Sequence, residues 1–570
     1  MKKLFAFIIV LMFCCIPSYA QIWEGSGGNH IDEGLGFDNG ISGGGSSLVT
    51  YTVAFTGYDQ SLWSGSTFTG VPKGLSLSVI TPTPSAAGYI FTGWTTASDY
   101  PNVITLPQKV NEDATYLALF QKQSYTLYYS LNGSTVHSEV YYYGDEVIPY
   151  IHNISSGKYA KWNDDPVTMP PATTTVTGIS VDTFVHAFEI EQSNSFNINY
   201  LYDSIGMSPI SVSNYGAAST ISNWDNTSTS WKSFAESIIK PVMLNQNGTI
   251  AYDLDPSDQT LKSDGVTNSD LTSFAAGQAT TANAMVQFKR LYKSAFYNYN
   301  TDKIIVAFSE YPLNHNFSAD AFTSEQGIIC ENMYLGMFEG YIYNNTLRSI
   351  YVNAKPSSRY SANTLVTAAE QNGSGWGIES YAMHDYVSML LMLFSKNVNL
   401  NTPYGTGHNV IPVNGTTNQY CNDIGITVSF PVFSRNETGG HPVKTLWLEN
   451  FWGNFAKYYI GLKIVGSDVY YKPYPPFYNS TDDVSAYYKI PKTGSDYTMA
   501  RTPFGILLPA SIANGKSLFG IYTYNWGLNS SYSYKRITDG GWGTVGFFPS
   551  GFATANTGNQ ITNSRLSYVK

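Results

Sequence analysis

Hydrophobic and polar residues alternate through residues 48 to 183, a pattern that predicts a run of β-strands. The pattern occurs twice, because each unit has an opening strand, a turn leading to a tryptophan, and a closing strand. The first unit opens at Tyr51 and reaches Trp94, and the second opens at Tyr125 and reaches Trp162. We expect two small β modules, each with its tryptophan in the core.

From about residue 186 onward, helical and strand patterns mix without further repeats. Apolar residues in the segment 376 to 396 fall on one helical stripe, and residues 389 to 394 are apolar on all sides. This predicts a central, buried helix. A shorter helix is expected over residues 281 to 292, and most of the remaining chain has the pattern of short strands between turns. The C-terminal half is therefore predicted to be an α+β domain.

The N-terminus combines Lys2 and Lys3 with an apolar run and a small-residue ending at Ala20, which is typical of a secretory signal over residues 1 to 20. The run is too short to span a bilayer, for which ~20 apolar residues are needed. We expect the exported chain to begin at Gln21 with a flexible Gly-rich linker over residues 21 to 47. Lipidation is disfavoured because bulky residues precede the two cysteines of the signal.

The composition favours a binding surface. Charged residues make up only 13% of the chain, whereas aromatic residues reach 15% and include 45 tyrosines. Tyr with Asn and Ser is the chemistry of adaptable binding sites. The net charge is -10 and basic residues do not cluster, so nucleic-acid binding is not expected. Only Cys330 and Cys421 follow the signal, and the sequence leaves open whether they form a disulfide.

The two β units resemble the internalin B repeat family of bacterial surface proteins, whose small β-grasp-like modules are strung along extracellular chains. The resemblance rests on the turn Gly88-Tyr-Ile-Phe-Thr-Gly-Trp94 and on its counterpart Gly157-Lys-Tyr-Ala-Lys-Trp162, which lacks the glycine before its tryptophan. It implies module boundaries at residues 48–122 and 123–185. It also implies that the modules act mainly as spacers.

Three motifs follow in order in the C-terminal half: the strand from Asn332 to Gly340, the turn Leu448-Glu-Asn-Phe-Trp-Gly-Asn454, and a terminal Gly-Gly-Trp-Gly that leads to Arg565-Leu-Ser-Tyr568. Together they resemble the C-type-lectin-like fold of the formylglycine-generating-enzyme type, as used in phage tail tropism proteins and in variable proteins diversified by retroelements. The resemblance implies one ligand-binding domain over residues 186 to 570. It assigns these motifs to the framework.

Within that framework, Arg565 is expected to pair with Glu339 or Glu449. In the variable members of the family the last few dozen residues contact the ligand. The resemblance therefore points to nine ligand-binding candidates that are Tyr, Trp or Asn: Tyr522, Tyr524, Asn525, Trp526, Asn529, Tyr532, Trp542, Asn556 and Asn559. An ordinary role of these residues in cross-strand pairs and turns stays open.

Catalytic chemistry is not expected. No cysteine follows Cys421, although the formylglycine-generating enzyme needs late cysteines, and His384, His408 and His441 lack metal-ligand spacing. The acidic loop 253–264 departs from the calcium-binding pattern at its sixth and twelfth positions. We therefore predict no catalytic residue, no metal and no cofactor. Glu339 and Glu449 are the carboxylate pair to test for glycoside hydrolysis.

The sequence thus predicts a multidomain protein in which two β-grasp-like modules precede an α+β C-type-lectin-like domain. The leading hypothesis is a secreted or cell-envelope, adhesin-like protein that recognises an extracellular protein or glycan and contacts membrane at most peripherally. One alternative is a phage tail receptor-binding protein, which the signal peptide disfavours. The other is a secreted carbohydrate-active enzyme, which would turn over a polysaccharide instead of retaining it.

Overall fold

In the computed structural model the chain divides into two compact units, whose described residues lie within 48–83 and 94–118 for the first and within 84–93 and 119–570 for the second. The predicted signal peptide and linker lie outside the described residues. The structure describes residues 48–191, 198–200, 231–273, 281–298, 300–301, 303–357, 360, 362–395, 404, 423–429, 442–451, 456–465, 468–472, 485–489, 499–501, 507–509, 517–518, 521–522, 535–537 and 562–570.

The first module is a four-stranded sheet in the order β2-β1-β4-β3. Its opening strand β1 and closing strand β4 are parallel neighbours. Trp94 is buried and its ring lies 5.0 Å from that of Phe55, so the tryptophan fills the core as predicted. The strands are β1 (Thr50–Gly57), β2 (Ser66–Pro72), β3 (Tyr89–Thr95) and β4 (Ala114–Lys122).

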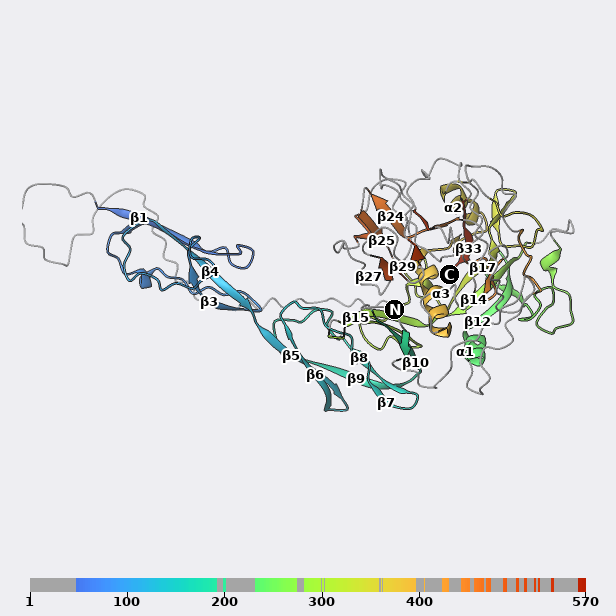
Figure 1. The fold of residues 1–570 in the computed structure, drawn as a ribbon, viewed down its shortest axis with the longest axis horizontal. Helices are drawn as coiled ribbons and strands as arrows, with labels where there is room; N and C mark the ends of the chain where they lie inside the picture. The colour runs from blue at the N-terminus through green and yellow to red at the C-terminus, as the bar shows by residue number, and fades with distance from the viewer. Residues whose placement is uncertain are drawn as a thin grey trace, which may run out of the picture. The chain divides into compact units, whose positions relative to one another are not determined.

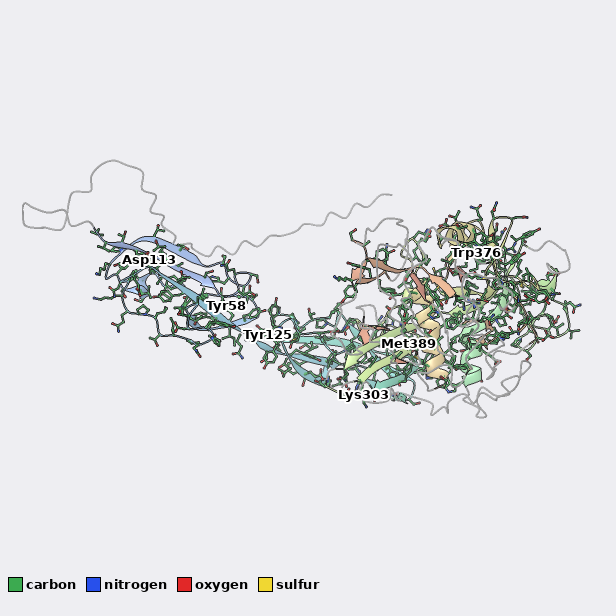
Figure 2. All side chains as sticks on the ribbon, turned by 45° about the horizontal axis from the view of Figure 1, so that its top comes forward. Tyr58, Asp113, Tyr125, Lys303, Trp376 and Met389 are labelled. Carbon is green, nitrogen blue, oxygen red and sulfur yellow. The ribbon has the colours of Figure 1, made fainter. Side chains whose placement is uncertain are left out.

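The second module has the same topology with one additional edge strand, in the order β6-β5-β9-β8-β7. Its opening strand, which starts beside Tyr125 (Figure 2), is again parallel to the closing strand. Trp162 is buried with its ring 5.0 Å from that of Tyr129, the same separation as in the first module. The strands are β5 (Ser124–Leu131), β6 (Ser134–Tyr142), β7 (Asn153–Ser155), β8 (Lys158–Asn163) and β9 (Thr174–Asp182).

The second module packs against the C-terminal domain, so it is more than a spacer. The backbone N–H of Trp162 donates to the carbonyl of Leu313 at 2.8 Å. Asp165 accepts from the His315 backbone at 2.9 Å, and its other oxygen lies 2.6 Å from the His315 ring Nδ1, with both side chains buried. Buried apolar residues from both parts, among them Tyr159 and Leu313, form one continuous cluster.

The C-terminal domain contains two larger sheets, with strand orders β11-β10-β16-β15 and β13-β12-β14-β17-β33-β20. The C-terminal strand β33 lies between β17 and β20, although more than 200 residues separate it from β17 (Figure 1). Their bounds are β10 (Val185–Glu191), β11 (Ile198–Tyr200), β12 (Ile239–Leu244), β13 (Ile250–Asp253), β14 (Asn283–Lys289), β15 (Tyr292–Asn298), β16 (Lys303–Ser309), β17 (Asn332–Glu339), β20 (Trp376–Ile378) and β33 (Arg565–Tyr568).

Both faces of the six-stranded sheet are covered. Alternation along β12 sends Met243 to a large core that includes α3, and Val242 to a second core that includes α2. Met389 of α3 lies among the packed side chains of the domain (Figure 2). Burial around the whole of α3 explains why residues 389–394 are apolar on all sides. The helices are α1 (Trp231–Ile238), α2 (Ala362–Glu370) and α3 (Tyr381–Ser395).

The prediction of a short helix over residues 281 to 292 is wrong. This segment forms the inner strand β14, which pairs with β12 and β17. Its alanine and methionine favour a helix locally, but both faces are buried in the sheet, and tertiary burial overrides propensity. The predicted helix 376–396 begins later than expected, because residues 376–378 form β20 on the edge of the same sheet.

The remaining strands are short. They are β18 (Tyr341–Tyr343), β19 (Thr346–Arg348), β21 (Lys444–Thr445), β22 (Leu448–Glu449), β23 (Ala456–Tyr459), β24 (Leu462–Val465), β25 (Asp468–Tyr471), β26 (Tyr488–Lys489), β27 (Met499–Arg501), β28 (Leu507–Pro509), β29 (Ser517–Leu518), β30 (Ile521–Tyr522), β31 (Lys535–Ile537) and β32 (Thr562–Asn563). No helix in the described ranges is long and apolar enough to cross a membrane. Cys330 is buried and not in a disulfide, and Cys421 lies outside the described residues.

Candidate functional site

The nine ligand-binding candidates fall where the structure does not describe side chains. The backbone of Tyr522 belongs to β30, whereas Tyr524, Asn525, Trp526, Asn529, Tyr532, Trp542, Asn556 and Asn559 lie outside the described residues. What the structure does describe is the backbone of the strands that border these residues, namely β30, β31 and β32.

Both ends of residues 538–561 are fixed to the same strand. β31 pairs antiparallel with β23 on one side, and β32 pairs parallel with β23 on the other. The chain therefore leaves a small sheet after Ile537 and returns to that sheet at Thr562. Trp542, Asn556 and Asn559 lie in this excursion. Binding residues are often carried between elements that a scaffold holds in place.

Arg565, at the start of β33, is the central residue of the scaffold. Its side chain is completely buried, and its guanidinium donates to four backbone carbonyls: those of Gly336, Met337, Glu449 and Asn450. These carbonyls belong to β17, to β22 and to the residue that follows β22. One guanidinium thus ties the C-terminal strand to both framework motifs that sequence analysis identified.

The carboxylate nearest to Arg565 in an ion pair is Glu379, whose Oε2 lies 3.8 Å from Nε. Sequence analysis expected Glu339 or Glu449 in this role. Glu339 is directly opposite Arg565 in the strand register, and Glu449 contributes its backbone carbonyl. The other oxygen of Glu379 lies 3.3 Å from Nδ1 of His384, which is buried and stacked on Phe451. His384 is therefore a residue of the core.

Glu449 is held by three hydrogen bonds. The Gly425 and Thr427 backbone N–H groups and the Thr427 hydroxyl all donate to its carboxylate, at 2.7 to 2.9 Å. Gly425 has a φ of 91° and lies against the Tyr351 ring, so only glycine fits there. Burial raises the pKa of Glu449, although these hydrogen bonds oppose the shift.

Lys444 pairs with Glu449 across the β21–β22 hairpin. Its Nζ donates to the side-chain oxygen of Gln259 and, at 2.7 Å, to the Thr427 carbonyl. Burial lowers the pKa of Lys444 to about 7. The two-residue turn of this hairpin consists of Leu446 and Trp447, with φ of 49° and 61°. Large side chains rarely adopt such values, and the burial of both residues holds the turn in this conformation.

No protein-family model matches the chain, and no curated protein sequence matches it. The chemistry of the site therefore has to come from its own geometry.

The geometry gives a sealed framework. Glu339 and Glu449, the pair to test for glycoside hydrolysis, are 2% and 1% exposed, and Asn450 donates to Glu339 at 3.2 Å. Two carboxylates buried in this way do not flank a substrate groove. Within the described part of the chain no group of three His, Cys, Asp or Glu side chains is placed to hold a metal. Asp255, Asp258 and Asp264 of the acidic loop accept hydrogen bonds from their own turns.

Sequence reasoning missed the buried Glu379, Lys444 and Lys457. Lys457 is 1% exposed and donates to the carbonyls of Asn450 and Phe451, at 2.9 Å for the latter. A charged residue is usually exposed, so the sequence around Lys444 and Lys457 does not indicate that they are buried. For Glu379 one signal was available, its position within the apolar segment that leads into α3.

Proposed function

We propose that this protein is an exported surface recognition protein whose lectin-like C-terminal domain contacts a protein or glycan ligand through its Tyr- and Asn-rich C-terminal segment. The observations that carry the proposal are that β30 and β31 border residues 523–534, which include Tyr524, Trp526 and Tyr532, and that residues 538–561 are attached on both sides of β23. The segment combines binding-loop composition with ends that are fixed to a rigid sheet.

The burial of the framework residues supports separate roles for the framework and for the ligand-binding segment. Arg565, Glu449 and Lys444 are at most 1% exposed and form hydrogen bonds within the interior. They fix the geometry of the framework without being available to a ligand. A buried ionic network of this kind contributes more to a unique geometry than to net stability.

Retention of a ligand is favoured over turnover by the same burial. The carboxylates that a glycoside hydrolase would use are best represented in this chain by Glu339 and Glu449, and both are enclosed. A second candidate function, a carbohydrate-active enzyme, therefore has no specific observation in its favour.

The proposal is tested with the exported full-length protein on a printed glycan array and on a panel of immobilised surface proteins. The triple variant Tyr524→Ala, Trp526→Ala, Tyr532→Ala should lose at least about tenfold in affinity, because aromatic anchors are each worth ~2 kcal/mol. The matched control replaces Tyr311 and Tyr343, which are 42% and 45% exposed elsewhere in the same domain, and should bind normally. Equal loss in both variants would contradict the proposal, as would consumption of a polysaccharide.

A further inference from the structure

Three ionisable side chains meet in the interior of the C-terminal domain, away from the Arg565 framework. Lys293 comes from β15, Asp385 from α3 (both labelled elements in Figure 1), and Asp320 from the single-turn helix Asp320–Phe322. Nζ of Lys293 is in direct contact with Oδ2 of Asp385. The two side chains are 7% and 2% exposed, so the contact is shielded from water.

Asp320 is the unusual member of this group. Its Oδ2 is sealed from solvent and has no hydrogen-bond partner within the described part of the chain. Asp320 and Lys293 line the same small cavity of about 10 Å³, together with Ser318, Tyr386 and three alanines. A cavity of this size can hold about one water molecule. Burial raises the pKa of Asp320 to about 6, so its acid form is populated near neutral pH.

We propose that Lys293 and Asp385 are joined by an intramolecular amide bond, formed by condensation of the lysine amine with the aspartic acid carboxyl, and that Asp320 carries the proton in this step. The product is an isopeptide cross-link between β15 and α3. The linked residues are 92 positions apart in the chain.

The step is balanced without an external reagent. Within the pair Lys293 gives a proton to Asp385, which leaves a neutral amine and a neutral acid. Nζ then attacks Cγ, the C–N bond forms, and the carbonyl electron pair moves to oxygen. Protonated Asp320 donates its proton to the departing hydroxyl, which leaves as water with the electrons of the C–O bond. Asp320 takes a proton back from the nitrogen, and a neutral amide remains.

Burial favours this condensation. An ion pair that is out of contact with water keeps a large desolvation penalty, and an amide removes both charges. The two reacting groups are already held in contact by the fold, which replaces a bimolecular encounter with an intramolecular one. The cavity lined by Tyr386, Ala382 and Ala321 has room for about one water molecule, too little to solvate both charges.

The other buried lysines lack this arrangement. Lys457 donates to backbone carbonyls. Lys444 donates to the Gln259 side chain and to the Thr427 carbonyl, and three other donors occupy the Glu449 carboxylate. Among the described lysines, the structure thus points to Lys293 for the cross-link.

The test is mass spectrometry of the full-length wild-type protein, unfolded and digested with trypsin. The expected product is a branched peptide that contains Lys293 and Asp385 and is lighter by one water molecule than its two parts, with no cleavage after Lys293. The internal control is the Lys240–Asp253 pair, which is also in contact, at 2.9 Å, but has side chains 43% and 39% exposed and should give separate peptides. Separate, unmodified peptides containing Lys293 and Asp385 from folded wild-type protein would overturn the proposal.

Two variants assign the roles. Asp385→Ala removes the electrophile and should give cleavage after Lys293. Asp320→Asn keeps the shape of the side chain, so the protein should fold, as checked by circular dichroism, while the branched peptide falls by at least about tenfold, a typical contribution of proton transfer. Full formation of the branched peptide in folded Asp320→Asn protein would contradict the role of Asp320.

Discussion

The first module and the C-terminal domain differ in what they bury. Within residues 48–122 the only buried polar side chain is Thr95, and the core is built on the rings of Phe55, Trp94 and Tyr116. The C-terminal domain encloses Arg565, Lys444 and several carboxylates in addition to a large apolar core. An aromatic core needs only local spacing, whereas an ionic interior requires partners from distant segments. The buried ionic groups therefore hold segments that are distant in the sequence in one fixed geometry.

The largest expected effect comes from breaking the ionic interior at Arg565. Arg565→Ala leaves Glu379 without its nearby cation and removes four hydrogen bonds to backbone carbonyls. We expect a loss of about 5 kcal/mol, at the upper end for a broken buried ion pair. Urea denaturation followed by tryptophan fluorescence measures this free energy of unfolding. A loss below about 1 kcal/mol would place Arg565 among ordinary surface residues.

The next largest effect is a pH dependence of the stability of the C-terminal domain, which we expect from His186 in β10. Its ring is fully enclosed by Phe184, Trp231 and Phe234, neither nitrogen has a partner in the described part of the chain, and burial lowers its pKa from 6.5 to about 3. The folded state therefore binds fewer protons than the unfolded state. This contribution to stability is fully present above pH 6.5 and is lost as the pH falls toward 3.

The lost stability should amount to about 4 kcal/mol over this range. His186→Phe keeps an aromatic ring in place but does not titrate, so its unfolding free energy should fall less steeply with acid than that of the wild type. Denaturant titrations at a series of pH values measure both slopes. Parallel slopes for the two proteins would show that His186 is not the group responsible.

A smaller effect distinguishes the second module from the first. Asp165 receives two contacts from His315 across the junction with the C-terminal domain. Asp165→Ala should cost about 3 kcal/mol, the lower end for a buried pair. The melting temperature of the full chain measures the loss, and limited proteolysis should show cleavage near the junction. If the melting temperature and the proteolysis pattern were both unchanged, the second module would act only as a spacer.

The smallest effect is expected on the surface of the second module. Lys158 pairs with Asp182 at 2.9 Å, but their side chains are 51% and 83% exposed. Lys158→Ala should change the free energy of unfolding by no more than about 0.5 kcal/mol. It is therefore the matched control for Arg565→Ala in the same denaturation series.

The opening strand, the buried tryptophan and the closing strand of each module could be predicted because their information is local, whereas β2, β6 and β7 were not predicted. Trp94 and Trp162 each follow their strand signals at a fixed place, and the structure buries both. In the C-terminal half the strand 332–339, the helix around Met389 and the final strand were also found, since each has a strong apolar pattern.

The remainder depends on long-range contacts that a single sequence does not display. Residues 283–289 favour a helix by composition but are the inner strand β14, because strands on both sides complete their hydrogen bonds. Glu379 became the neighbour of Arg565 only through the pairing of β20 with β33. The nine candidate binding residues stay predictions.

The central claim is that ligand recognition resides in the C-terminal segment and is separable from the framework. The most direct test is to measure binding and melting temperature together for the triple variant of Tyr524, Trp526 and Tyr532. The account predicts a loss of at least about tenfold in affinity at an unchanged melting temperature. Normal binding, or a melting temperature that falls as it does for Arg565→Ala, would contradict it.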